Sequence, residues 1–407
     1  MPIFYRIVGE DGPKVWGLSP EQRIDRVLRK LLQGQGDTPG PWTADAGCSS
    51  EESKILLLRS DYLLDERVIE GLIRKARLDL VVEAEGVPVA ALVAPERLTT
   101  AEKILAGQQE DEAGLATERL EKVGTSISRK LRKVSPPFAI RLTKGNISQV
   151  EHHLFNEAYK GITDLVTKWL WPKPAEHVVR FCANHGIRPN HVTAMSWVLA
   201  ILAGILFYAG YLGMGLVLGW VMTFLDTVDG KLARVTVDSS PFGHLFDHVL
   251  DVIHPPLWYL AWGLGLSQYQ PVLLKMPVMQ AFWLLLAAYI VGRVVEVVFK
   301  KFVAGFSIFI WQPVDSINRL IIARRNPCLI LLTLGLVFGR PDLGFEAVTL
   351  WMLLSTLFLV LRLAMALVSK KQGGALRPWL DQIDPKSAQG VECWFITPAS
   401  THVPRTD

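Results

Sequence analysis

The sequence has little of several features that would assign a chain to a functional class at once. It holds four cysteines: Cys48, Cys182, Cys328 and Cys393. They are scattered without the spacing of a metal site, so we expect free thiols in a reducing compartment. Residues 1–30 lack a basic start followed by an apolar core, so no N-terminal signal peptide is expected. A net charge of +4 is too small to indicate a nucleic-acid partner.

Apolar residues, in contrast, are abundant and unevenly placed. Half of the residues are hydrophobic and the mean hydropathy is +0.26, although the first third of the chain is polar. This asymmetry predicts a multidomain protein, with a soluble α/β domain followed by an all-α polytopic membrane domain. The expected parts are a soluble domain at 1–125, a linker with an interfacial helix at 126–190, the membrane domain at 191–370 and a cytoplasmic tail at 371–407.

The membrane domain is predicted to have about six transmembrane helices. The apolar segments lie at about 192–209, 212–228, 248–268, 278–299, 327–339 and 345–368. The fifth is short, since a bilayer core takes roughly 20 helical residues. Six spans place both termini on one side, and Lys and Arg gather there. The positive-inside rule therefore predicts a multi-pass protein of the cytoplasmic membrane, with both termini in the cytoplasm.

Four carboxylates recur around the end of the second apolar segment and the start of the third. They are Asp226 and Asp229, three residues apart, then Asp247 and Asp251, four residues apart. On helices, such spacings place each pair on one face. Acidic groups at the mouth of membrane spans are costly, and four together would repel one another unless cations lay between them. Oxygen-only ligation suits a hard divalent ion, so the sequence predicts Mg²⁺ or Mn²⁺.

Small residues stand between the two pairs. Gly230 would let a ligand or a second backbone come close, Ala233 leaves space one turn further on, and Gly243 opens the second helix. The whole pattern, with Arg234, reads D-x2-D-G-x2-A-R-x8-G-x3-D-x3-D. An Asp at a helix start is often only a cap, but caps do not require eight residues in register. The pattern resembles the signature of the CDP-alcohol phosphatidyltransferase family at every position, and the resemblance covers roughly residues 187–370.

This resemblance implies roles for the signature residues. Asp226, Asp229 and Asp247 would be metal ligands, while Asp251 would either share a metal or act as a general base. Gly230 and Ala233 would make room for the cytidine of a CDP-alcohol, and Arg234 would touch a phosphate or only lipid headgroups.

A second motif precedes the first apolar segment. Residues 186–193 read GIRPNHVT, and related enzymes carry a similar Pro-Asn-x-x-Thr in this position. Pro189 suits the first turn of a helix. Asn190 and Thr193 are therefore expected beside the CDP-alcohol.

The family resemblance also implies a reaction. A phosphatidyl or other phospho-alcohol group would pass from CDP-diacylglycerol or a similar donor to an acceptor alcohol, with release of CMP, in phospholipid biosynthesis. Such a transfer requires charge neutralisation and in-line positioning, which two ions about 4 Å apart supply. A homodimer among membrane lipids is implied as well.

Two other classes of function fit parts of the sequence. An ion-coupled transporter would also use intramembrane Asp, Arg and Glu, but here the acids cluster at one mouth and no inverted repeat is visible. A noncatalytic scaffold with a decayed site would not be expected to keep all eight signature residues.

Basic residues within and after the fourth apolar segment have two interpretations. Arg293 and Glu296 lie one turn apart inside it, which is costly unless they face a cavity or each other. The loop that follows carries Arg319, Arg324 and Arg325. Arg293, Arg324 and Arg325 could bind the phosphate of an acceptor alcohol, since Arg suits bidentate phosphate binding. The loop arginines could also be only the positive flank of a span.

The first 125 residues resemble the sugar-nucleotide nucleotidyltransferase fold in two stretches. Residues 14–32 are similar to the stretch after that family's lysine, and residues 56–73 to its metal-aspartate strand and helix, with Asp61 in the metal position. Its Gly-rich loop of the type AAGxGxR, which supplies N–H groups to phosphates, is missing before Lys14. We therefore expect a degenerate, noncatalytic domain. Some archaeal relatives fuse an active cytidylyltransferase to this membrane domain, so the fusion itself is reasonable by analogy.

Local patterns predict several elements of these N-terminal regions. Residues 54–58, 78–82 and 87–93 read as strands, the last two joined by a hairpin at Glu85 and Gly86, and residues 115–127 read as a charged helix. Residues 147–171 have an amphipathic helical pattern. This segment could lie in the membrane interface or pack on the soluble domain.

Overall fold

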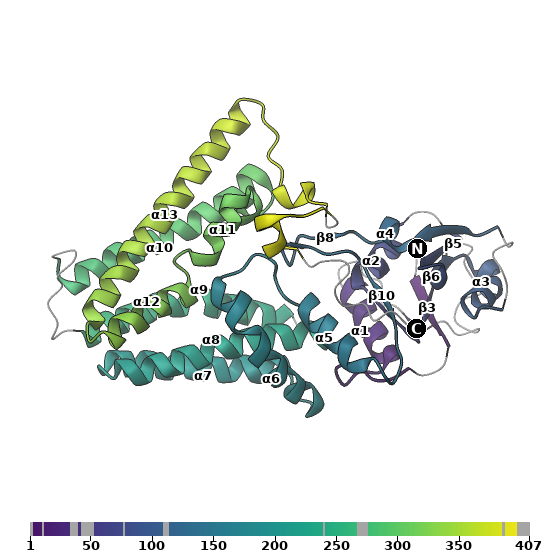
Figure 1. Ribbon diagram of the computed structural model, residues 1–407, viewed down its shortest axis with the longest axis horizontal. Helices are drawn as coiled ribbons and strands as arrows, with labels where there is room; N and C mark the ends of the chain where they lie inside the picture. The colour runs from purple at the N-terminus through teal and green to yellow at the C-terminus, as the bar shows by residue number, and fades with distance from the viewer. Residues whose placement is uncertain are drawn as a thin grey trace.

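The structure is a computed structural model with an α/β part and a helical part (Figure 1). It describes residues 3–9, 12–32, 40–41, 53–75, 78–108, 114–238, 241–266, 276–384 and 387–396. The side chains of residues 40–41, 241–248 and 250 lie outside this description, as does the whole of Cys48. Cys182, Cys328 and Cys393 are free thiols, as predicted.

A six-stranded mixed sheet forms the centre of the α/β part. Its strands are β1 (Ile3–Val8), β2 (Gly40–Pro41), β3 (Lys54–Arg59), β5 (Leu80–Ala84), β6 (Val87–Val93) and β7 (Ala116–Arg119), in the order β2-β1-β3-β6-β5-β7. β1 is parallel to β2 and β3, β6 is antiparallel to β3 and β5, and β7 is parallel to β5. The hairpin prediction is confirmed. Its turn residues, Glu85 and Gly86, both have positive φ (52° and 82°), as a type I′ turn requires.

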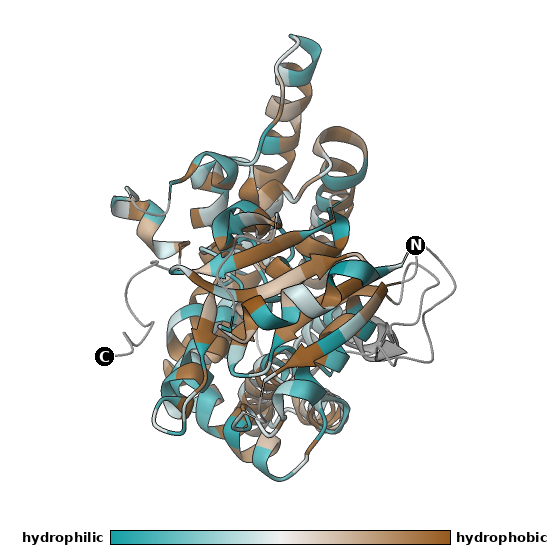
Figure 2. Cartoon of the chain, turned by 90° about the vertical axis from the view of Figure 1, so that its right-hand side faces the viewer, coloured by the Kyte–Doolittle hydropathy of each residue, from teal (hydrophilic) through white to brown (hydrophobic). Residues whose placement is uncertain are grey.

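Helices cover the two faces of this sheet. α1 (Pro20–Leu32) and α2 (Glu66–Arg74) pack on one face, and α3 (Leu98–Leu105) packs on the other. In Figure 2 the strands are largely brown, whereas the surrounding helices mix brown with teal, as expected for a covered sheet. A short strand, β10 (Ala139–Arg141), returns to pair with β4 (Tyr62–Leu64). The helix predicted for residues 115–127 is wrong, because this segment pairs with the sheet as β7 and keeps only the four-residue helix α4 (Leu120–Val123).

The amphipathic segment 147–171 is not one helix. It contains α5 (Ile147–Glu157) and a π-helical turn, η2 (Val166–Leu170), before α6 (Pro172–Asn184). α5 buries Val150 and Phe155 in a cluster shared with the α/β part, whereas Trp169 and Leu170 of η2 are exposed. The first half therefore packs on protein, and only the second half offers an apolar surface.

Seven helices make up the described helical part. They are α7 (Pro189–Tyr208), α8 (Leu212–Val235), α9 (Pro241–Gly265), α10 (Val278–Val298), α11 (Pro313–Ile321), α12 (Arg325–Val337) and α13 (Pro341–Lys371). Within the described residues, α7, α8, α10 with its π-helical continuation to Ala304, and α13 are long and apolar enough to span a membrane. The bent pair α11 and α12, which meet at 43°, would make a fifth span.

The predicted count of six spans is therefore not reached by the described residues. α12 has 13 residues, about 20 Å at 1.5 Å per residue, which is shorter than a hydrocarbon core of about 30 Å. α9 carries the second Asp pair and three histidines in its sequence, and these reduce its apolar character.

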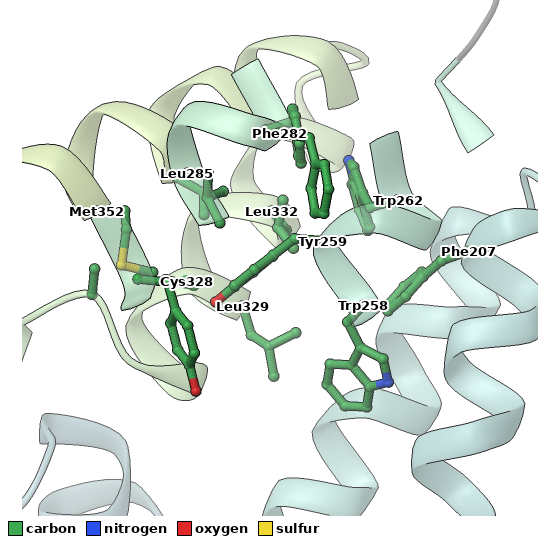
Figure 3. Packing of buried hydrophobic residues seen from close by; sticks show 14 of the residues in the cluster. Phe207, Trp258, Tyr259, Trp262, Phe282, Leu285, Cys328, Leu329, Leu332 and Met352 are labelled. Atoms are coloured by element: carbon green, nitrogen blue, oxygen red, sulfur yellow. The ribbon is translucent and has the colours of Figure 1, made fainter. Parts of the chain in front are cut away.

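Aromatic side chains fill the centre of the helical part (Figure 3). The indole Nε1 of Trp258 on α9 donates to the Ala200 carbonyl of α7 at 2.7 Å. Phe207 packs edge-on against Trp262 with ring centroids 5.0 Å apart. Tyr259 and Cys328 also belong to this cluster, which therefore joins α7 and α9 to α12.

The end of α8 leaves the helical part and enters the α/β part. Arg23 Nη2 on α1 donates to the Val235 carbonyl at 2.6 Å, and Arg26 Nη1 donates to the Thr236 carbonyl at 2.8 Å. Val237 follows with a φ of 50° and is buried in the sheet's own core cluster. Guanidinium groups at a helix C-terminus satisfy its open carbonyls and complement its dipole. The α/β part therefore caps α8.

Trp16 makes a second contact between the two parts. It lies in the loop between β1 and α1 and is only 1% exposed. Its backbone N–H donates to Glu151 Oε1 at 2.8 Å, and its indole Nε1 donates to the Glu151 carbonyl at 3.1 Å. It shares a buried cluster with Val228 and Leu232 of α8. The loop after the first strand therefore attaches the α/β part to α5 and α8.

Candidate active site

The first carboxylate pair lies in the half of α8 that is predicted to face the cytoplasm, and Asp229 is tied to α7. Asp229 is 5% exposed, and its Oδ2 accepts a hydrogen bond of 2.6 Å from Thr193 Oγ1. α7 begins at Pro189, as predicted, and this start places Thr193 one turn into the helix. Two residues from separate motifs thus meet, while Asn190 lies exposed at the helix start.

Arg325 joins the first carboxylate pair to the second. Its Nη2 forms an ion pair with Asp226 Oδ2, and its Nη1 donates to Asp251 Oδ1 at 2.9 Å. The Asp251 side chain is 48% exposed, whereas that of Asp226 is 15% exposed. One positive group therefore holds carboxylates from α8 and α9 at the first residue of α12.

The remaining signature residues are placed as follows. A Cβ on Gly230 would lie 3.1 Å from Arg234 Nη2, so the Arg234 side chain folds back over the glycine. Ala233 is partly buried on the same helix. Gly243 and Asp247 belong to α9, but their side chains lie outside the described residues.

Two arginines contact Glu296. Arg324 Nη2 donates to Glu296 Oε1 at 2.6 Å and to Oε2 at 2.5 Å. Arg293 Nη1 lies 3.6 Å from Glu296 Oε1, and its guanidinium lies 5.0 Å from the centre of the Tyr289 ring. The mid-span Arg293 and Glu296 therefore face each other, one of the two arrangements expected from the sequence.

Arg319 was not among the three arginines assigned to a phosphate from the sequence. Its Nε and Nη1 are buried without a hydrogen-bond partner among the described residues, as are Asn318 Nδ2 and Arg324 Nε. Its guanidinium lies 5.5 Å from the centre of the Phe309 ring. The sequence signal was present, since Arg319 stands in the basic loop, but a loop charge alone does not show whether its donors are paired.

The donor set fits a hard cation. Asp226 of α8 and Asp251 of α9 both contact Arg325. Asp229, which also lies on α8, is the third carboxylate of the group. Within the side chains that the structure describes, no three His, Cys, Asp or Glu residues gather closely enough to form a complete metal site. The side chain of Asp247, the fourth signature carboxylate, lies outside that set.

The segment that carries these residues matches a known family. Residues 187–361 match the model of the CDP-alcohol phosphatidyltransferase family. This part of the chain is a CDP-alcohol phosphatidyltransferase domain. The domain contains both Asp pairs and Thr193, and its apolar helices make the chain an integral membrane protein.

Three curated proteins are similar to the chain over shorter segments. Archaetidylinositol phosphate synthase of Pyrococcus horikoshii is 36% identical over 80 residues, which are 19% of this chain and 42% of that protein. The bifunctional IPC transferase and DIPP synthase of Rubrobacter xylanophilus is 40% identical over 65 residues, 16% of this chain and 15% of that protein.

The third is choline/ethanolaminephosphotransferase 2 of Arabidopsis thaliana. It is 36% identical over 87 residues, 18% of this chain and 22% of that protein. The chain thus spans less than half the length of each of these relatives. The phosphatidyltransferase domain is shared with a recognised family, whereas residues 1–186 lie outside the family match.

Proposed function

We propose that the protein transfers a phosphatidyl or other phospho-alcohol group from a CDP-alcohol to an acceptor alcohol, with release of CMP, in phospholipid biosynthesis. The observation that carries the proposal is that Asp226 and Asp251 both contact the guanidinium group of Arg325 inside the phosphatidyltransferase domain. The burial of Asp229 beside them on α8, held by Thr193, supports it further.

The carboxylates have separate roles in this reaction. Asp226, Asp229 and Asp247 would hold divalent cations, which we propose to be two Mg²⁺ or Mn²⁺ ions. Such ions neutralise the pyrophosphate of the donor and steady the leaving CMP. Asp251 is the more exposed carboxylate of the Arg325 pair, so an acceptor hydroxyl can reach it. As general base it takes the hydroxyl proton while the acceptor oxygen bonds to phosphorus and the bond to CMP breaks.

The donor would bind beside the first helix pair. Gly230 has no side chain, which leaves its face of α8 open to a nucleotide apart from the movable Arg234. Ala233, Asn190 and Thr193 are assigned to the same CDP-alcohol. CDP-diacylglycerol is the proposed donor.

A phosphate-bearing acceptor is the second part of the proposal. The buried, unpaired donors of Arg319 are costly unless an anion receives them, and Arg293 and Arg324 lie beside Glu296 in the same region. We therefore add Arg319 to Arg293 and Arg324 as the acceptor-phosphate group. Arg325 would take part only if it left its carboxylates. The similarity to a protein named archaetidylinositol phosphate synthase agrees with a phosphorylated polyol.

The orientation and assembly belong to the proposal as well. The excess of Lys and Arg around the signature side favours a cytoplasmic active site and cytoplasmic termini in the cytoplasmic membrane. A homodimer through the membrane helices is carried over from the family resemblance.

Release of CMP by the purified protein tests the function. We expect release with CDP-diacylglycerol, Mg²⁺ or Mn²⁺ and one member of a panel of acceptor alcohols, and loss of release in Asp251→Asn and with EDTA. Arg319→Gln should raise KM for a phosphorylated acceptor about tenfold or more, as loss of a charge-assisted hydrogen bond of about 1.5–3 kcal/mol implies. Release that persists with EDTA would contradict the metal assignment. No release with lipid or soluble CDP-alcohols would favour the transporter or scaffold.

A further inference from the structure

A basic pocket lies outside the phosphatidyltransferase domain. It is a cavity of about 280 Å³ between strand β9 (Lys133–Val134), the segment that joins α5 to α6, and the C-terminal segment 387–396. Its walls include Lys133, Lys160, Lys168, Tyr159, Trp394 and Phe395. A water molecule takes about 30 Å³ in the liquid, so the cavity has room for a phosphate group and several waters. Every described lining residue lies outside 187–361.

The positive charges of the pocket are only partly balanced. Lys133 Nζ donates to Glu157 Oε2 at 2.7 Å, and this pair is neutral. Lys168 Nζ donates to the Gly161 carbonyl at 2.8 Å and lies 5.2 Å from the centre of the Phe395 ring, neither of which carries a negative charge. For Lys160 the described residues provide no hydrogen bond or ion pair, and no carboxylate among them lines the cavity. Within this part of the chain, Lys160 and Lys168 therefore face the cavity without a carboxylate in its wall, although the charge of Asp251 reaches Lys160.

Neighbouring groups lower the pKa of both amines, although the Lys160 side chain is exposed and that of Lys168 is partly buried. Desolvation by the surrounding protein, followed by the charge of Arg234, lowers the pKa of the Lys160 ammonium to about 8. Desolvation and the charge of Lys133 lower the pKa of Lys168 to about 8 as well. An anion in the cavity would offset both effects, because an opposite charge favours the protonated amine.

The pocket lies beside an exposed aromatic surface. Trp169 and Trp394 pack edge-to-face with ring centroids 5.9 Å apart, and both are largely exposed together with Leu170. Tryptophan is typical of the headgroup level of a bilayer. The cavity would therefore lie at the depth of lipid phosphates.

We propose that this pocket binds a phosphate group, carried either by the headgroup of an anionic phospholipid or by a soluble phosphate. The bound anion would join the segment after α5 to the C-terminal segment, since each contributes a wall. The cavity shares no lining residue with the acceptor group at Arg319, although the charges of Arg319 and Asp251 reach Lys160, and its ligand need not take part in the transfer.

Thermal unfolding of the full chain in detergent tests the proposal by binding alone. The probes are phosphatidylglycerol, phosphatidylcholine as the neutral lipid, and sodium phosphate. A ligand that binds the folded state raises the unfolding temperature in proportion to its saturation. We expect Lys160→Gln to weaken binding of the anionic probe about tenfold, Lys160→Arg to retain it, and Trp394→Ala to weaken it. Lys300→Gln removes an exposed lysine that does not line the cavity and should change nothing.

The probes distinguish the two sources of the phosphate. Stabilisation by phosphatidylglycerol beyond that by phosphatidylcholine identifies a lipid headgroup, and equal stabilisation by sodium phosphate alone identifies a soluble ligand. Wild-type affinity for both probes in Lys160→Gln would overturn the proposal. A loss in Lys160→Gln with none in Trp394→Ala or Lys168→Gln would also overturn it, because the anion would then lie among the charged residues of the candidate active site.

Discussion

Thr193 shows how one hydroxyl can fix a carboxylate. Its hydrogen bond to Asp229 crosses from α7 to α8, and both residues are buried. A ligating carboxylate held in this way keeps its orientation, and loss of such a partner typically costs 10–100-fold in metal affinity or activity. We predict a loss of this size in CMP release for Thr193→Val, with a higher Mg²⁺ requirement. Ser196→Ala is the control, because Ser196 donates only within its own helix. Unchanged Mg²⁺ dependence would remove Thr193 from the site.

Glu157 balances a buried lysine at the junction of the two parts. Desolvation opposes its ionisation, but the ion pair with Lys133, which is 3% exposed, lowers the pKa of the Glu157 carboxyl below its ordinary value. Glu157→Gln would leave the lysine without a counter-ion, and we predict a loss of about 3–5 kcal/mol. Glu70→Gln breaks the exposed pair with Arg74 and should cost under about 1 kcal/mol.

The same pair predicts a dependence of stability on pH. Because the folded pKa of Glu157 is depressed, its contribution is complete above the unfolded value of about 4.3 and is lost as the pH falls through the folded value. Unfolding temperatures of the wild type and Glu157→Gln should therefore converge in acid. A constant difference between them down to the lowest pH would contradict this origin.

At the scale of single residues, spacing predicted some partners and could not predict others. The spacing of the Asp pairs predicted one site for Asp226, Asp229 and Asp251, and the family resemblance placed Thr193 beside the CDP-alcohol. The contacts of Arg325 with these carboxylates could not be predicted, because the positive-inside rule already explains a basic residue at the start of a span. Its carboxylates are 99 and 74 residues away in sequence.

At the scale of elements, α8 belongs to both parts of the chain. Its membrane portion carries the first Asp pair, and its end is held by Arg23, Arg26 and Trp16. We predict that Trp16→Ala lowers stability by about 3–5 kcal/mol, as loss of a buried aromatic does, and also lowers CMP release. Trp283→Ala is the control, since Trp283 is 60% exposed. Normal release at reduced stability would show that docking does not set the geometry of the site.

Element boundaries were predictable where one pattern dominated. The β5–β6 hairpin and the start of α7 followed from turn chemistry and Pro189. The amphipathic pattern of residues 147–171 did not reveal the break between α5 and η2, because buried contacts to α8 replace helical hydrogen bonds there. Lys231 Nζ of α8, for example, donates to the Ala158 carbonyl at 3.2 Å. Tertiary contacts of this kind leave no period in the sequence.

At the scale of the whole molecule, the two parts share their cores. Val237 is buried with the sheet, and Trp16 is buried with α8. We predict that Leu57→Ala, which opens a cavity in the sheet core far from the signature, lowers the temperature at which CMP release is lost. The expected destabilisation is about 2–5 kcal/mol. Val87→Ala, at an exposed position, should leave that temperature unchanged. Two separate transitions, with release surviving the first, would show independent parts.

The division into an α/β part and a helical part with candidate membrane spans followed from composition and local sequence patterns. The connection between them did not, because the contacts that join α1 to the end of α8 span more than 200 residues of sequence. Whether the α/β part descends from a nucleotidyltransferase stays a prediction. In the structure Asp61, assigned to the metal position, forms a bidentate pair with Arg59 at 2.8 and 2.7 Å.

The position of Arg325 has a consequence for how the chain is made. Carboxylates at the mouth of a membrane span resist insertion when they carry uncompensated charge. Here the polypeptide supplies its own counter-charge to Asp226 and Asp251 from the start of α12. Once α12 is synthesised, the bundle can close in the bilayer whatever the supply of divalent ions in the cell. Assembly would then not depend on the divalent cations that we propose for turnover.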